Sequence, residues 1–350
     1  MSSGQQWSKS VGLTLVLLLL ASCTESKKPA AGPTGGAAGA AAAKSLASVP
    51  GCEGAVLPNL ETIESGTYSP LSRPLFVYVN TKALKKPEVA AYVKVLLGAA
   101  QDKVEKAGFI KLKDSLLKEQ QAKLEAAIAD VVIPEKITSG SVSVNGSSTV
   151  YPFSAVAAEL FEKANDSKVH VTVGKKGTGG GFEKFSIGET DISNASREIK
   201  ASEIEKCKAN NVEYIELSVC IDGLTVCVNP ANTWCSCLTV EQLKALWEPG
   251  SKVKKWSELN PAWPAENIGL YGPDTDSGTY DYFTEVVVGK ARSSRSDYTQ
   301  SSEDNVLVKG IAGDKYALGY FGYSYYDKNR KKLNAVGIIP AAKVEKAEKK

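Results

Sequence analysis

Histidine is almost absent from this sequence, since His170 is the only one among 350 residues. It lies in a run of β-forming residues, Val169 to Val173, where successive side chains alternate between the two faces of a strand. Hydrolysis requires a nucleophile with a base or a cluster of metal ligands, and histidine commonly serves in both. A single histidine within a strand favours neither a nucleophile with its base nor a metal cluster, so we expect no enzymatic activity, no metal and no cofactor.

A surplus of positive charge is also lacking. The net charge is only +3, and no basic stripe is interleaved with aromatic residues, so nucleic acid is not an expected partner. The apolar run Val11 to Leu20 is too short to span a bilayer. With Lys9 before it and the lipobox Leu20-Ala21-Ser22-Cys23 at its end, this run predicts a lipoprotein signal peptide over residues 1–23.

Cleavage before Cys23 would make this residue the lipidated N-terminus of the mature chain. Residues 24–56, rich in Ala, Gly and Pro, would then form a flexible tether between the bilayer and the folded part. We therefore expect a lipid-anchored protein of the cell envelope that faces the periplasm or the outer surface. An uncleaved anchor is the alternative.

Six cysteines follow Cys23, and an even number in an exported chain favours disulfides. Six cysteines allow fifteen pairings, so the sequence alone leaves the pairing open. Metal binding is the competing interpretation, because Cys235-Ser236-Cys237 lies near Cys227. The spacing is not that of a CxxC pair and no histidine is nearby, so disulfides are favoured. The six residues are Cys52, Cys207, Cys220, Cys227, Cys235 and Cys237.

The chain after residue 23 is long enough for two domains, and its 43% hydrophobic content suffices for real cores. Strand-like and helix-like segments alternate along it, which predicts the α/β class. Expected strands cover 72–80, 141–144, 169–173, 189–193, 224–228, 268–271 and 334–339. Expected helices cover 87–98, 112–132, 153–165, 180–187, 201–209, 239–247 and 279–289.

Three of the strand-to-helix turns are rich in glycine and hydroxyl residues: Asn145 to Pro152, Lys175 to Phe182, and Asp274 to Thr279. Glycine lets the backbone approach a ligand closely, hydroxyl groups donate and accept hydrogen bonds, and the first turn of a helix offers free amides. Together the turns predict a site for a small tetrahedral oxyanion. Ser148 or Thr149 as an ordinary helix N-cap remains the alternative.

These turns also carry a family resemblance. Gly146 to Pro152, Gly177 to Phe182, Asp191 to Arg197, Asp276 to Thr279 and Leu318 to Tyr323 resemble the motifs of PstS-like phosphate-binding lipoproteins of phosphate ABC transporters, in the family's order. The similarity runs from about residue 60 to 340. It implies a two-lobe periplasmic-binding-protein (type II) fold with a hinge, and a monomer that binds inorganic phosphate and delivers it to the permease subunits.

The resemblance also implies a set of ligand-binding residues. Arg197 would be the counter-charge, because its guanidinium can donate two hydrogen bonds to two phosphate oxygens. Asp276 would accept the phosphate proton and so reject sulfate, although it is equally suited to N-cap the next helix. The resemblance pairs Cys207 with Cys237 and leaves the other four cysteines unassigned. The implied phosphate ligands are Ser147, Ser148, Thr149, Thr178, Gly179, Ser196, Arg197, Asp276, Ser277, Gly278 and Thr279.

The order of the segments departs from the family. Residues 60–128 resemble the family's C-terminal part, a joint follows near Pro134 to Ser139, and the family-like N-terminal part begins at 140, which reads as a circular permutation. Lobe one would consist of residues 57–222. The hinge strand and lobe two would consist of residues 223–340, and a charged tail would follow over 341–350. Strand 73–80 would pair beside 224–228, leaving one covalent crossover between the lobes at residues 222–228.

Two other functions remain open from the sequence. One is a secreted phosphoester hydrolase, which the scarcity of histidine disfavours. The other is a phosphate sensor or surface interaction protein that uses the same fold for protein contacts. Loss of phosphate binding would point to a surface interaction protein.

Overall fold

The computed structural model describes residues 46 and 48–340 of the chain. The predicted signal peptide, the lipidation residue Cys23, most of the predicted tether and the charged tail lie outside these residues. Within them, strands and helices alternate as expected, and the α/β class is confirmed. No helix in this part of the chain is long and apolar enough to cross a bilayer.

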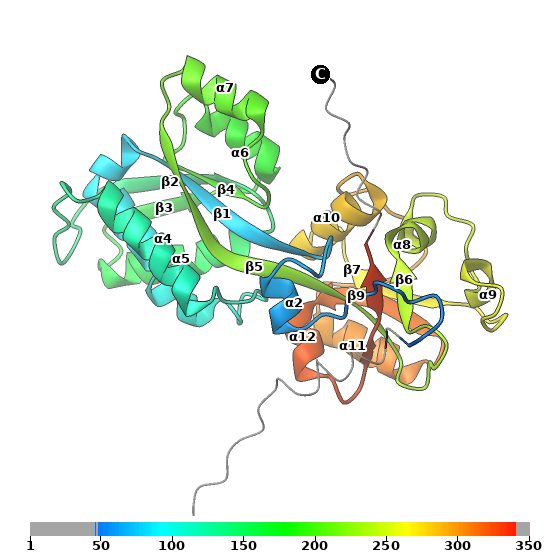
Figure 1. The fold of residues 1–350 in the computed structure, drawn as a ribbon. Coiled ribbons are helices and arrows are strands. Elements are labelled where there is room, and N and C mark those ends of the chain that lie inside the picture. The colour runs from blue at the N-terminus through cyan, green and yellow to red at the C-terminus, as the bar shows by residue number, and fades with distance from the viewer. Residues whose placement is uncertain (1–45, 47, 341–350) are drawn as a thin grey trace, which may run out of the picture.

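One curled sheet extends through the whole molecule (Figure 1). Its strand order is β3-β2-β4-β1-β5-β9-β7-β8, with β10 beside β5, while β6 and β11 form a separate parallel pair. The strands are β1 Ser72–Asn80, β2 Ser141–Gly146, β3 His170–Val173, β4 Ile192–Ala195, β5 Tyr214–Val228, β6 Cys237–Thr239, β7 Gly269–Pro273, β8 Thr299–Ser301, β9 Ala317–Gly322, β10 Asn334–Ala335 and β11 Gly337–Ile339.

Helices gather around the two ends of this sheet and leave its middle narrow (Figure 1). We call the part around β2, β3 and β4 lobe one, and the part around β7, β8 and β9 lobe two. Lobe one carries α3 Pro87–Leu96, α4 Asp114–Ala127, α5 Tyr151–Ala164, α6 Gly177–Phe185 and α7 Ala201–Ala209. Lobe two carries α8 Val240–Trp247, α9 Trp256–Leu259, α10 Gly278–Phe283, α11 Asp304–Gly313 and α12 Tyr323–Lys328, and α2 Leu60–Glu64 lies near β5.

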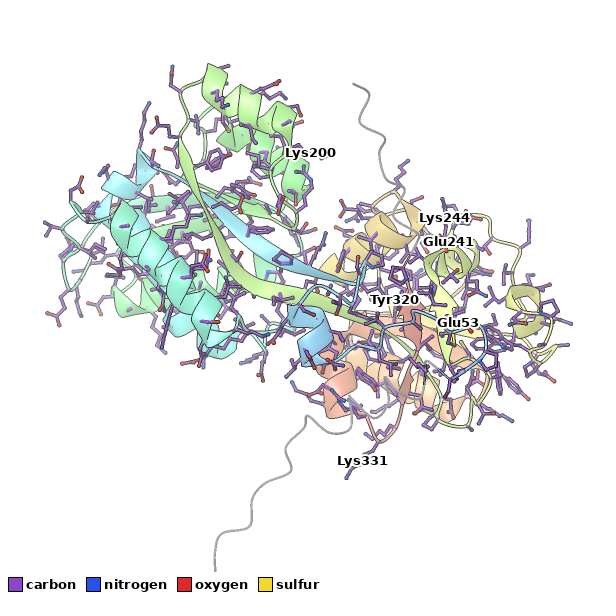
Figure 2. All side chains as sticks on the ribbon, viewed as in Figure 1. Glu53, Lys200, Glu241, Lys244, Tyr320 and Lys331 are labelled. Atoms are coloured by element: carbon purple, nitrogen blue, oxygen red, sulfur yellow. A yellow bond between two sulfur atoms is a disulfide. The ribbon has the colours of Figure 1, made fainter. Side chains whose placement is uncertain are left out.

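Apolar periodicity explains how the helices dock on the sheet. In α3, Pro87 occupies the first turn, where no amide donor is needed, and the apolar face around Tyr92 is buried. In lobe two, Tyr320 of β9 points into the interior (Figure 2) and stacks on Phe283 of α10 with ring centroids 3.6 Å apart. This stacking holds the end of α10 against the sheet, and the helix begins at Gly278, in one of the predicted anion-binding turns.

Strand β5 is the common spine of the two lobes. Its residues Tyr214–Gly223 pair with β1, and Leu224–Val228 pair with β9. The predicted pairing of strand 73–80 beside 224–228 is therefore wrong. Strand β1 pairs with the first two thirds of β5, with a register shift between Leu75 and Phe76, and the last third of β5 pairs with β9.

The prediction of a single covalent crossover is also wrong, because the segment before β1 lies against lobe two. Val56 forms an antiparallel bridge with Ile338 of β11, and the hydroxyl of Tyr282 in α10 donates to the carbonyl of Pro70 at 2.8 Å. The chain thus passes between the lobes twice, through β1 and through β5. Residues 48–56, which the sequence assigned to the tether, are attached to the folded body.

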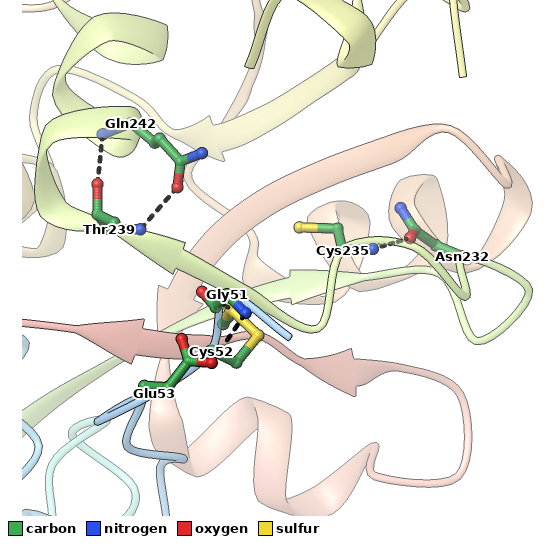
Figure 3. Close-up of a disulfide and its surroundings, with 8 residues drawn as sticks. Gly51, Cys52, Glu53, Asn232, Cys235, Thr239 and Gln242 are labelled. Atoms are coloured by element: carbon green, nitrogen blue, oxygen red, sulfur yellow. Dashed lines mark hydrogen bonds between the residues drawn. A yellow bond between two sulfur atoms is a disulfide. The ribbon is translucent and has the colours of Figure 1, made fainter. Parts of the chain in front are cut away.

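The disulfide differs from the predicted one. Cys237 of β6 is bonded to Cys52, with Cα atoms 5.7 Å apart (Figure 3), and not to Cys207. Cys207 lies on α7 in lobe one. Cys237 lies in lobe two, beside β11, the strand to which Val56 is bridged. In the described part of the chain Cys207, Cys220, Cys227 and Cys235 are free and buried, so they serve as small apolar core residues.

Candidate functional site

Two of the three predicted turns meet where the lobes face each other. The turn after β2 contributes Ser148, whose Oγ donates to Asp281 Oδ2 of α10 at 2.7 Å. Thr149 Oγ1 donates to the carbonyl of Gly278 at 3.4 Å. A Cβ atom at Gly278 would lie only 2.7 Å from Thr149 Cα, so the absence of a side chain permits this approach.

The turn after β2 depends on a glycine as well. Gly146 has φ of +139°, and a Cβ atom there would collide with the backbone of Asn194 in β4. Gly181 of α6 packs directly over Gly146, and a Cβ atom added to Gly181 would lie only 2.5 Å from Gly146 Cα. These close approaches hold the starts of α5 and α6 beside the ends of β2 and β4, so that their free amides share one edge of the sheet.

A cavity of about 550 Å³ lies beside the contact between the two turns. Six of the predicted ligand residues line it: Ser148, Thr149, Asp276, Ser277, Gly278 and Thr279. Other groups in its wall are Lys106, Tyr151, Lys175, Asp222, Asp274, Asp304 and Tyr325. The cavity therefore combines two helix starts, several hydroxyl groups and charges of both signs.

Neither turn uses Ser148, Thr149 or Asp276 as the N-cap of its helix. The N-cap of α5 is Val150, which has no side-chain cap, and the N-cap of α10 is Ser277, whose Oγ accepts from the Thr279 amide at 3.2 Å. The N-cap alternative is therefore wrong for Ser148, Thr149 and Asp276. The Asp276 side chain is 92% exposed, with Arg292 as a partner at 4.0 Å.

The remaining predicted residues form a second group in lobe one. Thr178 Oγ1 and Ser196 Oγ are hydrogen-bonded at 3.0 Å, and the Ser196 amide donates to Thr178 Oγ1 at 3.2 Å. Gly179 follows Thr178 in the first turn of α6, while buried Ser147 donates its amide to the Asn194 carbonyl at 2.9 Å. None of these four residues lines the 550 Å³ cavity.

Arg197, the predicted counter-charge, is engaged by a carboxylate. Its Nη1 and Nη2 atoms donate to the two carboxylate oxygens of Glu203 at 2.8 Å each, and Nη1 also donates to the Glu198 carbonyl. The hydrogen bonds that the Glu203 carboxylate accepts raise the pKa of Arg197. With both terminal nitrogens bonded to Glu203, Arg197 would have to break this pair to donate to an anion in the same way.

Arg73 of β1 is a cation that the sequence analysis did not select. Its side chain is 13% exposed and lies 3.5 Å over the ring of Tyr282 in lobe two. Nη2 donates to Thr149 Oγ1 of lobe one at 3.4 Å, and Nη1 donates to Glu285 Oε2 of lobe two at 3.2 Å. Arg73 therefore lies on β1, one of the two strands that pass between the lobes, and it contacts both lobes beside the meeting turns.

The structure offers little support for chemistry that needs histidine or a metal. His170 is exposed on β3 and does not line the cavity. Within residues 46 and 48–340, no group of three or more potential metal ligands is brought together. The cavity instead has the hydrogen-bond donors and charges that suit a non-covalently bound anion.

Comparisons with known proteins place the chain in a family of binding proteins. A family model described as "PBP superfamily domain" matches residues 134–350. Protein SphX from Synechocystis sp. is 45% identical over 204 residues, covering 57% of this chain and 60% of SphX. The phosphate-binding protein PstS from Staphylococcus saprophyticus is 42% identical over 199 residues, which cover 57% of this chain and 60% of PstS.

One solved structure supports the same relationship. The crystal structure of "a possible phosphate binding protein" from Planctomyces limnophilus shares 54% sequence identity with this chain. The superposition has a TM-score of 0.56 and covers 58% of this chain and 71% of that chain. The chain thus spans about three fifths of the length of the curated relatives named above.

Proposed function

Because the chain belongs to the PBP superfamily, with the type II fold, we propose that it binds inorganic phosphate between its two lobes and delivers it to the permease subunits of an ABC transporter. The observation that carries this proposal is the meeting of the Ser148–Thr149 turn with the Ser277–Thr279 turn at the wall of one cavity. The name of the relative from Staphylococcus saprophyticus, a phosphate-binding protein, supports the choice of phosphate. Binding rather than catalysis is the proposed activity.

The meeting turns provide donors from two sides. The starts of α5 and α10 present backbone amides without intrahelical partners, and Ser148, Thr149 and Thr279 add hydroxyl groups. A tetrahedral anion needs donors spread around it, and two facing turns supply this arrangement. Binding would favour the closed arrangement of the lobes, since only there do both turns reach the anion.

A buried anion also requires a cation. Arg73 satisfies this need best, because it is largely buried and already donates to Thr149 at the contact between the lobes. Arg197, Thr178, Gly179 and Ser196 remain a second proposed group, which reaches the anion only if Arg197 leaves Glu203. Asp276 is too exposed to be the main discriminator of phosphate from sulfate.

Calorimetric titration of the purified protein with phosphate and with sulfate tests the proposed function. We expect one phosphate per chain and much weaker binding of sulfate. If neither anion binds, transport of phosphate is excluded, and a surface interaction protein with this fold becomes the better account. Hydrolysis of a phosphoester by the same preparation would instead favour an enzyme.

Replacing Gly278 by alanine should weaken phosphate binding roughly ten- to a hundredfold. The added methyl group would lie 2.7 Å from Thr149 Cα, and backbone atoms cannot yield as a flexible side chain can. The lobes should therefore close less completely. Calorimetry measures the affinity, and Gly313→Ala is the control, because nothing lies within 4 Å of a Cβ atom there. Equal affinities for the two variants would contradict the proposed role of the contact.

We also propose that Cys23 carries a lipid anchor on the mature protein. The sequence pattern of residues 1–23 supports this, although these residues lie outside the described part of the chain. Cys23→Ser should leave the protein unlipidated, because the thiol is the acceptor atom, and membrane association should be lost on fractionation. A variant that still pellets with membranes after a high-salt wash would contradict the anchor.

We further propose that the chain is a circular permutation of the family order. The bridge between Val56 and Ile338 supports it, because it brings the start of the described chain beside its end. The extent of the matches is also consistent, since the PBP superfamily domain begins at residue 134, close to the predicted joint near Pro134 to Ser139. The residues before the joint nevertheless supply β1, a strand in the middle of the sheet.

Relinking the chain in family order should therefore preserve function. A variant that starts at Ser139, runs to Pro340 and continues through a flexible linker of about ten residues into 48–134 keeps both crossovers and Cys52. Phosphate affinity should stay within about tenfold of the natural order, and the interlobe distance distribution of the unliganded protein should be unchanged. A soluble, folded variant without phosphate binding would count against this account.

A further inference from the structure

We propose that the cavity beside the meeting turns also takes phosphate monoesters whose short organic group carries an ammonium, with Asp304 of lobe two as the residue that binds this ammonium. The inference rests on the proposed function for the phosphate end of the ligand. It adds a second subsite to the same cavity, at the start of α11, and phosphoethanolamine is the simplest ligand of this class.

The cavity is larger than inorganic phosphate alone requires. Its volume of about 550 Å³ lies within the range of roughly 300–1,000 Å³ that is usual for sites of organic ligands. This space exists while the two turns already touch, since Ser148 donates to Asp281 and Thr149 donates to the carbonyl of Gly278. An anion held by the turns therefore leaves room in the cavity for an attached organic group.

The wall of the cavity carries an excess of negative charge. Four aspartates and two lysines of the described chain line it: Asp222, Asp274, Asp276, Asp304, Lys106 and Lys175. Such a wall opposes a ligand that is only anionic and attracts one that also carries a positive charge. The organic group that suits this wall is therefore cationic.

Asp304 is the carboxylate of this wall that lacks a counter-charge. It is the first residue of α11 and is half-buried. In the described part of the chain its side chain forms no hydrogen bond and no ion pair, and burial together with the charge of Glu303 raises its pKa to about 7. An ammonium group placed beside Asp304 would neutralise this charge where water solvates it poorly.

Two other aspartates of the wall already have partners. Asp274 Oδ1 accepts from the Asp276 amide at 3.1 Å, and Arg292 Nη2 lies 4.0 Å from Asp276 Oδ1. The Asp276 side chain is also 92% exposed, so water and salt screen its charge. Asp304 therefore gains more than either residue from a cationic ligand.

A buried acceptor in the same wall points to a ligand independently of the excess of charge. The side chain of Asp222 is 5% exposed, and its Oδ2 atom accepts no hydrogen bond, while Arg73 Nε lies 3.9 Å from this atom. Buried polar atoms are normally hydrogen-bonded, so this oxygen calls for a donor from a bound molecule. A ligand ammonium brings three donors, which Asp304 and other acceptors of the wall can share.

Calorimetric titration of the wild type with phosphoethanolamine, glycerol phosphate and inorganic phosphate tests the subsite. Both esters have a short polar substituent, but only that of phosphoethanolamine is charged. At pH 8, above the raised pKa of Asp304, we expect phosphoethanolamine to bind roughly ten- to a hundredfold more tightly than glycerol phosphate, the gain from one charge-assisted hydrogen bond. Equal affinities for the esters, tighter binding of glycerol phosphate, or no binding of either ester overturns the inference.

Asp304→Asn tests the assigned residue, and Glu303→Gln is its matched control. Glu303 is the preceding carboxylate in the chain, is exposed and does not line the cavity. Asp304→Asn should lower the affinity for phosphoethanolamine about tenfold or more and change that for glycerol phosphate much less, while Glu303→Gln should keep the wild-type preference. A wild-type preference in a folded Asp304→Asn variant, or a loss of preference in Glu303→Gln alone, overturns the assignment.

The two proposals fail in different ways. If the wild type binds neither inorganic phosphate nor the esters, the proposed function is wrong and the subsite is lost with it. If the wild type binds inorganic phosphate but does not prefer phosphoethanolamine to glycerol phosphate, only the subsite is wrong.

Discussion

Replacing Arg73 by glutamine should weaken phosphate binding by two to three decades, or roughly 3–4 kcal/mol, the scale of a buried charge pair that loses one partner. The guanidinium is 13% exposed and touches both lobes through Thr149 and Tyr282, so no nearby water can fully replace it. Glutamine keeps part of the aliphatic stem over Tyr282 and removes the charge. Calorimetric titration with phosphate measures the loss.

Arg197→Gln is the matched control for this experiment. Arg197 is paired with Glu203, so its replacement should change phosphate affinity much less than that of Arg73. Arg73→Gln should still fold, which circular dichroism and thermal denaturation can verify. A large loss of phosphate affinity in Arg197→Gln, together with unchanged affinity in Arg73→Gln, would restore Arg197 as the counter-charge and contradict the role of Arg73.

Replacing Cys52 by alanine should lower the free energy of unfolding by about 2–5 kcal/mol, the usual range for a native disulfide. The bond joins residues 185 positions apart, and closing so long a loop restricts the unfolded chain strongly. It also fastens residues 48–56 to lobe two beside β6 and β11. Thermal denaturation should show a clearly lower midpoint, with phosphate affinity retained.

The control distinguishes this disulfide from the pairing that the resemblance implied. A reductant should lower the midpoint of the wild type and of Cys207→Ala, because both keep the bond between Cys52 and Cys237. It should leave Cys52→Ala unchanged. If reductant no longer affects Cys207→Ala, the bond in solution involves Cys207 and the observed pairing is wrong.

The local elements were largely predictable from the sequence. Strand 72–80 and helix 201–209 have the expected bounds, because periodicity and turn residues act over short distances. The two turns that line the cavity were predictable for the same reason. Free amides at a helix start follow from the backbone itself, so Thr149 and Gly278 could be selected before their contact was known.

The residues that depend on long-range pairing could not be selected in this way. Arg73 precedes Thr149 by 76 positions, and the two meet only because β1 lies between β4 and β5 in the sheet. The partner of Cys237 likewise follows from the pairing of Val56 with β11. The pair of Arg197 with Glu203 is only six positions apart, so a local ion pair at the start of α7 could have been considered.

Strand β5 shows a different limit of sequence reasoning. Asp222 and Gly223 interrupt its apolar pattern, and the sequence analysis therefore began the expected strand only at residue 224. The strand nevertheless continues from Tyr214 to Val228, because neighbours on both lobes pair with it and Gly223 packs against Ile63 and Ile110. The polar interruption marks the buried carboxylate at the hinge and not the end of an element.

A crystal structure of the protein with phosphate is the most direct test of the central claim that the anion binds between the meeting turns. We predict tetrahedral density in contact with Thr149 and the amides around Gly278, with the Arg73 guanidinium within hydrogen-bonding distance of a phosphate oxygen. Phosphate held by Arg197 and Thr178 alone, without contact to Gly278 or Arg73, would contradict the claim.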